Sequence, residues 1–387
     1  MTAPTSTIVS GADASAEARD ATSARHAAPS VGEVLVLGVV TFLVLWLVVA
    51  SMDDLRARGE ETGDNARYAR IASAIRHWDF STVHPRHFWG LPYAAAVVSL
   101  TTGISAYAAV VLISVVASLS ALAVAHRLWG GLVAAWFAIL SWDWMQRSAL
   151  GGAEPLFVAL VFAALLAARY ERWLTASLLA SAATTVRALG IFVLVGIAAA
   201  LLARRDWRRL AAATGIGIGI GVAYAIPLYH AFGGAGGNVT FYWRYWLGDF
   251  PIAVPLMPLL NGLLASTQPL TNVLKIGAWV ALILVGSVLF LASRRCREAC
   301  RRYPVELTFF GLYVLFLVTV DSRQWSWQEF PRFAVPVLPF ALVGLERWLP
   351  RDRRILWAVA ICSGALAGAS ALDVRYAAAF LRLWLEL

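Results

Sequence analysis

The sequence predicts an all-α polytopic membrane protein, because it is too apolar for a soluble one. Of its 387 residues, 60% are hydrophobic and only 14% are charged, whereas about a quarter of the residues of a soluble protein are charged. Seventeen Trp and eighteen Phe residues fit the aromatic belts found at membrane surfaces. The apolar runs have the length that a helix needs to cross lipid.

The apolar runs predict about eleven transmembrane helices. A shorter apolar segment at 90–103 is expected to form a re-entrant or interfacial helix. The runs lie at about 31–51, 104–126, 131–147, 154–170, 173–187, 190–203, 210–231, 273–293, 305–320, 332–349 and 355–371.

The domain organisation predicted is simple. Residues 1–30 are rich in Ala, Ser and Thr and lack the apolar core of a signal peptide, so we expect a disordered cytoplasmic tail there. Residues 31–387 form a single transmembrane domain. External loops at 52–90 and 232–272 carry the amphipathic segments.

Arginine distribution predicts the orientation. The net charge of +9 is almost all Arg, since Lys275 is the only lysine. The short loops 204–209, 294–302 and 346–354 are strongly basic and are separated by an even number of predicted spans. By the positive-inside rule these loops and the amino terminus are cytoplasmic. The arginines are scattered between spans, which argues against nucleic-acid binding.

The predicted external loops carry the polar residues that suggest chemistry. Within the first, an amphipathic surface helix is expected over 65–75. Asp64 stands at its start, either as an N-cap or as a general base at the lipid–water boundary. The stretch HPRH nearby adds His84, Arg86 and His87, but Pro85 breaks any helix that would align the two histidines on a metal. Two cysteines alone, Cys296 and Cys300, make a poor metal site.

Further polar residues follow at the ends of later spans. Asp143, Arg147 and Glu154 surround one predicted external loop. Glu154 opens a span before Pro155, where a carboxylate is favoured by the helix dipole, and it could equally orient a ligand hydroxyl or an arginine. Arg187 lies between two short apolar runs, so it either snorkels to the surface or clamps a phosphate.

The last external loop adds Arg323, Glu329 and Arg332 in DSRQWSWQEFPRF. Two arginines that converge from different helices would make a phosphate or pyrophosphate site. The aromatic loop 233–250, which contains Trp243, forms an interfacial belt, a stacking platform for a sugar or a wall of a lipid-tail groove. GIGIGIG at 215–221 lacks nucleotide-loop spacing and predicts close helix packing.

The order of these motifs resembles the glycosyltransferase C superfamily, polytopic enzymes that use a polyprenyl-phosphate sugar as donor. Members include protein O-mannosyltransferases and the aminoarabinose transferases of lipid A. Over roughly 32–349, DNARYARIA from Asp64 matches the first external loop and HPRHFWGLPY the start of the next segment. AEPLF at Glu154 is followed by TTVRALG at Arg187, and RFAVPVLP from Arg332 comes last.

The resemblance implies roles for individual residues. Asp64 would be the catalytic base, and Tyr68 would support the acceptor or the loop. Glu154 would orient a substrate or a partner in the catalytic site, and Arg187 and Arg332 would hold the lipid phosphate. A third phosphate-binding candidate is Arg323, and the remaining substrate-binding candidates are His84, Arg86, Asp143 and Trp243.

Three positions depart from the superfamily pattern. Asn65 replaces the second acid of the common Asp-Glu pair, Ala188 replaces a proline after Arg187, and Phe333 replaces the tyrosine after Arg332.

The resemblance implies a membrane glycosyltransferase of hexosyl or pentosyl type, mannosyltransferase-like, in a bacterial inner membrane. It would move the sugar from a polyprenyl-phosphate donor to an envelope lipid, glycan or protein acceptor on the extracytoplasmic side, with inversion. No cofactor is required, although some members use a divalent cation. A transporter or flippase for a lipid-linked glycan is the alternative, and it would need polar groups throughout the membrane. A membrane acyltransferase would need a catalytic histidine in or near a span. His230, at the end of a span, is the only loose candidate, since His126 lies on the cytoplasmic side.

Overall fold

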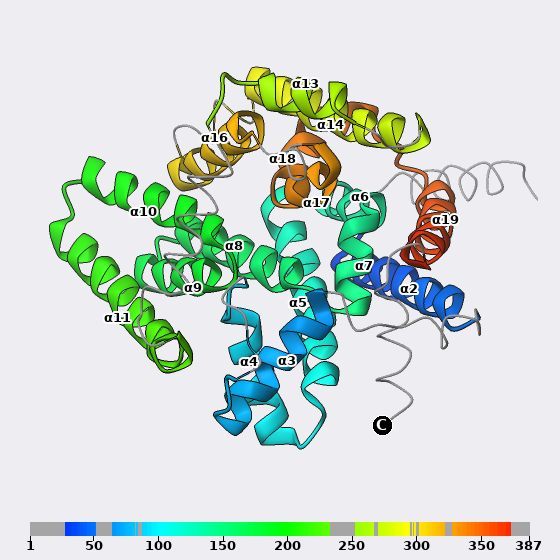
Figure 1. Cartoon of the computed structure of the whole chain (residues 1–387). Coiled ribbons are helices and arrows are strands. Elements are labelled where there is room, and N and C mark those ends of the chain that lie inside the picture. The colour runs from blue at the N-terminus through cyan, green and yellow to red at the C-terminus, as the bar shows by residue number, and fades with distance from the viewer. Residues whose placement is uncertain are drawn as a thin grey trace, which may run out of the picture.

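The computed structural model describes residues 28–51, 64–81, 83, 87–232, 252–266, 270–294, 296, 298, 302–321 and 327–372. Within these ranges the chain is helical, and the one pairing of extended backbone is an isolated bridge between Ile252 and Val320. Figure 1 shows the helices gathered around a central group that contains α5, α8 and α9. The all-α class predicted from the sequence is confirmed, and the apolar helices make the chain a multi-pass membrane protein.

The helices follow the predicted apolar runs closely. The α-helices are α2 (Val31–Ala50), α3 (Asp64–His77), α4 (Gly90–Thr102), α5 (Ala106–Trp129), α6 (Gly131–Leu140), α7 (Trp142–Leu150), α8 (Ala153–Arg169), α9 (Trp173–Val186), α10 (Ile191–Ala203), α11 (Trp207–Phe232), α13 (Met257–Leu264), α14 (Leu270–Ala292), α16 (Pro304–Thr319), α17 (Phe330–Ala334), α18 (Leu338–Leu345) and α19 (Arg353–Leu372). Three 3-10 turns join some of them: η2 (Ala188–Gly190), η4 (Val335–Val337) and η5 (Glu346–Trp348).

Two predicted spans are broken rather than continuous. The run at 131–147 divides at Ser141 into α6 and the start of α7, and α7 then meets α8 at an angle of 105°. The run at 332–349 divides into α17, η4 and α18, because Pro336 and Pro339 remove backbone donors. Among the described residues, four helices are long and apolar enough to cross a membrane, or five with the bent pair counted as one. Shorter apolar helices make up the rest, so length does not fix the number of spans.

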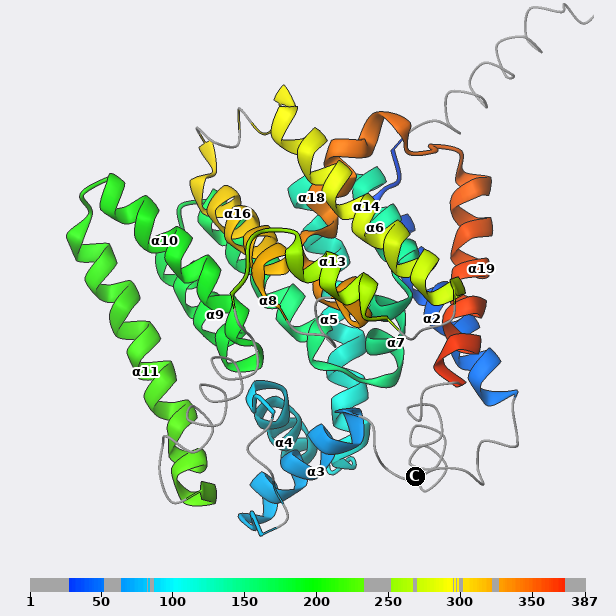
Figure 2. The ribbon, with the colours of Figure 1, turned by 45° about the horizontal axis from the view of Figure 1, so that its top comes forward.

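The core is packed from aromatic and small side chains. α8 packs against α5 and α9, α2 against α19, and α14 against α18, as Figure 2 shows from a second direction. Gly364 and Gly368 let α19 approach α2 closely, since a Cβ atom at Gly364 would lie 2.7 Å from the Thr41 carbonyl oxygen. Small residues at such spacing are a common basis for helix association in membranes.

Most glycines of GIGIGIG (215–221) do not lie at a close contact between helices. A Cβ atom added at Gly215, Gly219 or Gly221 would meet nothing within 4 Å, and only Gly217 comes near a neighbour, the Ser181 hydroxyl at 3.6 Å. α11 lies at the outer edge of the molecule (Figure 1) with Ile218, among other apolar side chains, exposed. The prediction of close packing is therefore wrong for three of these four glycines.

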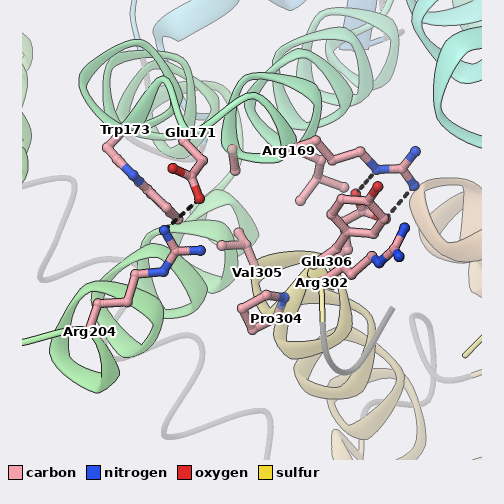
Figure 3. A pocket seen from close by; sticks show the side chains of 11 residues that line it. Arg169, Glu171, Trp173, Arg204, Arg302, Pro304, Val305 and Glu306 are labelled. Carbon is pink, nitrogen blue, oxygen red and sulfur yellow. Dashed lines mark hydrogen bonds and ion pairs between the residues drawn. The ribbon is translucent and has the colours of Figure 1, made fainter. Parts of the chain in front are cut away.

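Ionic contacts occur at both ends of α8, with Glu154 in its first turn and Arg169 in its last. At the second end Arg169 pairs with Glu306 of α16, and Arg204 pairs with Glu171 at 2.7 Å (Figure 3). The first end holds a larger cluster around Asp64 and Glu154, described next.

Candidate active site

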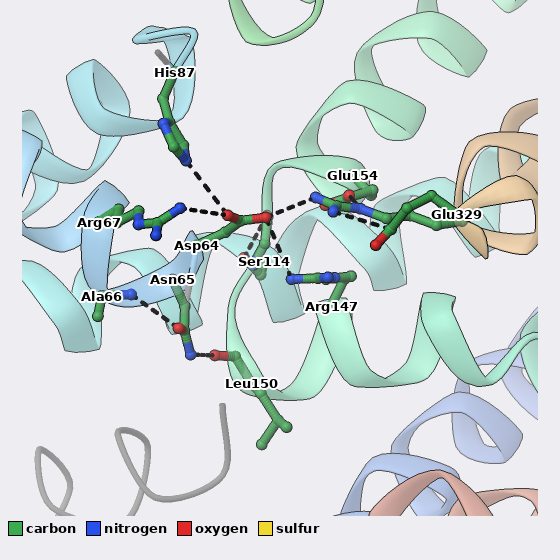
Figure 4. Close-up of polar contacts among 12 residues, drawn as sticks. Asp64, Asn65, Ala66, Arg67, His87, Ser114, Arg147, Leu150, Glu154 and Glu329 are labelled. Atoms are coloured by element: carbon green, nitrogen blue, oxygen red, sulfur yellow. Dashed lines mark hydrogen bonds and ion pairs between the residues drawn. The ribbon is translucent and has the colours of Figure 1, made fainter. Parts of the chain in front are cut away.

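Asp64 begins α3, and its two carboxylate oxygens face different partners (Figure 4). Oδ1 lies 3.4 Å from Nε2 of His87 and 3.8 Å from Nη1 of Arg67. Oδ2 accepts a hydrogen bond of 3.0 Å from Nη2 of Arg332 and lies 3.8 Å from Nη1 of Arg147. The residue is therefore the centre of an ionic cluster, and an N-cap role alone does not account for these contacts.

Glu154 is the second carboxylate of the cluster, and it is more deeply buried, with a side chain only 4% exposed. Its Oε1 atom accepts hydrogen bonds from both Arg187 and Arg332. Arg332 also contacts Glu329, 3.4 Å away in the preceding turn. One guanidinium therefore joins Asp64 on α3 with Glu154 on α8, although 268 positions separate Asp64 from Arg332 in the sequence.

Breaks in the helices place these side chains. Arg187 lies at the C-cap of α9 with extended backbone (φ −150°, ψ 133°), directly before the 3-10 turn η2. Glu154 follows the glycine bend between α7 and α8, and Arg332 lies in the five-residue α17. Each charge thus sits at a helix end, where the chain turns, rather than in the middle of a long apolar helix.

Two glycines make the bend before Glu154 possible. Gly151 has φ +91°, a conformation that side chains with a Cβ atom rarely adopt. A Cβ atom at Gly152 would lie 2.9 Å from Cβ of Arg147 and 3.0 Å from Oε2 of Glu154. The Ser114 hydroxyl bonds both backbone groups of Gly152, at 3.0 Å each. Close packing at this bend therefore fixes Arg147 relative to Glu154.

Asn65 anchors the helix that presents Asp64. Its amide nitrogen donates to the Tyr107 hydroxyl at 2.9 Å and to the Leu150 carbonyl at 3.0 Å. These bonds tie α3 to α5 and α7, and Asn65 itself is fully buried. The residue that departs from the acidic pair of the superfamily pattern therefore has a structural role here.

Charge around Asp64 keeps it ionised. Burial alone would raise its pKa, but the hydrogen bond with His87 and the charges of Arg332 and Arg147 outweigh burial and hold the pKa of Asp64 well below its usual range. Burial and the nearby carboxylates of Asp64 and Glu154 raise the pKa of Tyr68, so its hydroxyl keeps its proton. The Tyr68 ring packs edge-on against His87, with centroids 5.3 Å apart.

The cluster carries a net positive charge. Among the described residues, four arginines surround three carboxylates, which leaves one excess positive charge (4 − 3) without counting His87: Arg67, Arg147, Arg187 and Arg332 around Asp64, Glu154 and Glu329. Asp143 and Lys275 extend the cluster on one side without changing the balance, since Asp143 feels the charges of Lys275, Arg147 and Arg332. The Lys275 ammonium also lies 4.6 Å from the Trp142 ring centroid.

One polar atom of the cluster remains without a hydrogen-bond partner among the described residues. Oε2 of Glu154 is fully buried, while Oε1 serves both arginines. Buried carboxylate oxygens are normally paired, so this atom has unused acceptor capacity directly beside Arg187 and Arg332. The described residues contain no group of three His, Cys, Asp or Glu side chains that could hold a metal ion.

The structure brings together six of the residues that the sequence singled out: Asp64, Tyr68, Asp143, Glu154, Arg187 and Arg332. Four others, His84, Arg86, Trp243 and Arg323, lie outside the described residues. The expected convergence of Arg187 and Arg332 occurs, and Glu154 is the group on which they converge.

Sequence reasoning left several members of the cluster out of the expected site. The sequence places Arg147 in a predicted external loop and assigns it no role, although it lies one helical turn after Asp143. The sequence suggests His87 only as a possible metal ligand. In the structure, Nε2 of His87 lies 3.4 Å from the carboxylate of Asp64. Lys275 had one available signal, since it is the only lysine of the chain.

No protein-family model and no curated protein matches the chain. Among solved structures, the crystal structure of ArnT from Cupriavidus metallidurans bound to undecaprenyl phosphate superposes with a TM-score of 0.50 at 14% identity, over 92% of this chain and 78% of that chain. The apo structure of ArnT gives a TM-score of 0.46 at 17% identity, over 90% and 76%. ArnT is a glycosyltransferase of the superfamily that the motifs resemble.

The chain shares the fold of ArnT. The resemblance drawn from the order of short motifs is thereby confirmed at the level of the fold. In this fold, one ionic cluster is shared by the motif residues Asp64, Glu154, Arg187 and Arg332, which are far apart in sequence.

We expect Gly152→Ala to disturb the cluster through packing alone. The new methyl group would press on Arg147 and Glu154, and overpacking of this kind costs about 1–3 kcal/mol. Gly215→Ala is the matched control, because its Cβ would lie in open space within α11. Thermal unfolding in detergent should show a lower midpoint for Gly152→Ala only; equal midpoints for the two variants would argue against a tightly packed bend.

Proposed function

We propose that this protein is a membrane glycosyltransferase that moves a sugar from a polyprenyl-phosphate donor to an acceptor. The observation that carries this proposal is the net positive cluster in which Arg332 contacts both Asp64 and Glu154. The fold shared with ArnT, which was crystallised with undecaprenyl phosphate, supports a ligand of the same chemistry here.

Arginine chemistry explains how a lipid phosphate would bind. A guanidinium presents donors in a planar fork that matches phosphate oxygens. In the structure the donors of Arg332 and Arg187 are directed at carboxylates, so a phosphate would compete with Asp64 for Arg332 and Arg147. Glu154 would hold Arg187 and Arg332 in place during that exchange, because it is buried between them.

This exchange has a chemical consequence for Asp64. While Arg332 and Arg147 contact Asp64, the low pKa of Asp64 makes it a weak base. When phosphate takes over Arg332 and Arg147, Asp64 loses positive neighbours and its basicity rises toward that of an ordinary carboxylate. Asp64 would therefore become an effective base only while a donor is bound.

The proposed reaction is a single displacement with inversion. Asp64 takes the proton from the acceptor hydroxyl or amine, which attacks the anomeric carbon of the sugar. A bond forms between the acceptor and that carbon as the bond from the carbon to the phosphate oxygen breaks. The lipid phosphate leaves with its negative charge, which Arg187 and Arg332 stabilise.

Finer features of the proposal follow the motif resemblance. The sugar is a hexose or pentose, the acceptor is an envelope lipid, glycan or protein, and Tyr68 and Asp143 contribute to substrate binding. The Asp64 cluster faces the extracytoplasmic side of a bacterial inner membrane, because the basic loops 204–209, 294–302 and 346–354 occupy the other side.

A flippase for a lipid-linked glycan is the competing proposal. Transport needs polar groups along a path through the membrane, whereas the residues singled out from sequence gather at one end of α8. The second ionic group, at Arg169 and Glu306, lies at the other end of that helix. Aromatic side chains of the buried core, such as Phe162 and Phe137, lie within α8 and α6 between them, which favours the enzyme.

We expect Asp64→Asn to leave the protein folded and to lower sugar transfer by about 10²–10⁴-fold, the usual contribution of a general base. Asp79→Asn is the matched control. Asp79 lies on the same polar segment as Asp64, is exposed, and accepts a hydrogen bond from the backbone N–H of Ser81. Transfer from a synthetic polyprenyl-phosphate sugar in detergent provides the assay, with size-exclusion chromatography as the check of folding. Retention of more than a tenth of the activity by folded Asp64→Asn protein would exclude Asp64 as the base.

The pH dependence should separate the free enzyme from the donor complex. Asp64 has a lowered pKa in the folded protein, so its charged form is present above the ordinary value of about 3.9 and is lost only at lower pH. The acid limb of kcat/KM, which reports the free enzyme, should therefore lie below about pH 4. The acid limb of the kcat profile should lie at a higher pH, because bound phosphate removes Arg332 from Asp64. Identical limbs in the two profiles, both near pH 5, would contradict the exchange.

A further inference from the structure

A second cavity lies at the far end of the helical bundle from the Asp64 cluster. Its volume is about 310 Å³, within the range of small-molecule sites. Arg169 in its wall and Glu154 in the cluster occupy the two ends of α8, about 22 Å apart at 1.5 Å per residue. The cavity is therefore separate from the proposed active site, and an inference about it stands independently of the transfer reaction.

The inner wall of this cavity is apolar. It consists of aromatic and aliphatic side chains from the ends of α5, α14, α16 and α18, among them Trp129, Phe290, Phe340 and Val343. The Trp129 and Phe340 ring centroids are 5.1 Å apart, and those of Phe290 and Phe340 are 5.6 Å apart. These rings hold one another in place, so the apolar surface is preformed.

The opposite wall is polar and held by a buried ion pair. Arg169 donates from Nη2 to Glu306 at 2.8 Å and from Nη1 to the Leu128 carbonyl at 2.8 Å. Its guanidinium lies 4.5 Å from the Tyr303 ring centroid. Arg169 and Glu306 thus neutralise each other, and the pair joins α8 to α16 beside the cavity.

Among the described residues, the outer rim carries one exposed arginine, Arg302, and one glutamate, Glu298. Arg302 lies next to the paired Arg169 and Glu306, as Figure 3 shows from a smaller neighbouring pocket that these three residues also line. Arg302 ends the segment 294–302, which has five Arg and one Glu, Glu298, and Glu298 also lines the cavity. The arginine distribution predicts that this segment faces the cytoplasmic leaflet, whose anionic lipids attract such basic segments.

We propose that this cavity binds an anionic phospholipid, with its phosphate at Arg302 and the first part of an acyl chain on the Trp129–Phe340 surface. An apolar wall beside the exposed Arg302, which ends a segment rich in arginine, matches an amphiphile with a negative head. A soluble anion would leave the aromatic wall without a partner. The proposal commits to a phospholipid of the bilayer; the polyprenyl donor belongs to the Asp64 cluster at the other end.

The test compares two lipids with identical acyl chains, phosphatidylglycerol and phosphatidylcholine, titrated onto the purified full chain and followed by native mass spectrometry. Wild-type protein should bind phosphatidylglycerol about tenfold more tightly. Arg302→Gln should remove most of that preference, because the rim loses the charge that meets the phosphate. Leu307→Trp, which fills the cavity from its lining, should weaken both lipids.

Arg209→Gln is the matched control, since Arg209 is an exposed arginine on α11 away from this cavity and pairs with Asp206. It should leave both affinities unchanged. Equal binding of the two lipids by wild-type protein would overturn the proposal, as would a preference that Arg302→Gln and Arg209→Gln reduce equally. Arg302 is exposed, so its replacement leaves the core intact. If Leu307→Trp fails to fold, the comparison of Arg302→Gln with Arg209→Gln still tests the proposal.

Discussion

The structure depends on one guanidinium, that of Arg332, held between two carboxylates from different parts of the chain. It donates to Asp64 on α3 and to Glu154 on α8, while Arg187 on α9 shares the same oxygen of Glu154. Charges buried in a membrane domain are costly unless they are paired. The cluster therefore constrains how α3, α8, α9 and α17 pack, and loss of one partner would leave an uncompensated charge.

The breaks in the helices are the means by which an apolar chain accommodates this cluster. The glycine bend before Glu154, the extended backbone at Arg187 and the short α17 around Arg332 each end a helix where a charge is required. The same bundle ends at its far side in a second ionic contact, Arg169 with Glu306, beside an amphipathic cavity. Polar groups at the two ends, with aromatic packing between them, are consistent with chemistry at one membrane surface and lipid contact at the other.

Much of this could be predicted from the sequence. Apolar runs and their length gave the all-α membrane class, and the periodicity after Asp64 gave α3. The order of short motifs gave the fold that ArnT shares. The prediction of one span over 131–147 is wrong because only residues 131–140 are uniformly apolar, whereas Asp143, Gln146 and Arg147 follow Ser141. Hydropathy averaged over the whole run hides this change.

The geometry of the site was beyond the sequence for a different reason. Arg147 and His87 join the cluster only through tertiary packing, and neither has a local pattern that marks a partner for Asp64. Asn65 looked like a lost acid, yet its amide fixes α3 through Tyr107 and Leu150.

The most direct test of the central claim is an experimental structure of the protein with undecaprenyl phosphate. The account predicts phosphate oxygens within about 3 Å of the guanidinium nitrogens of Arg332, with the contact between Arg332 and Asp64 broken and that with Glu154 kept. A lipid phosphate bound elsewhere, with Arg332 still bonded to Asp64, would contradict it.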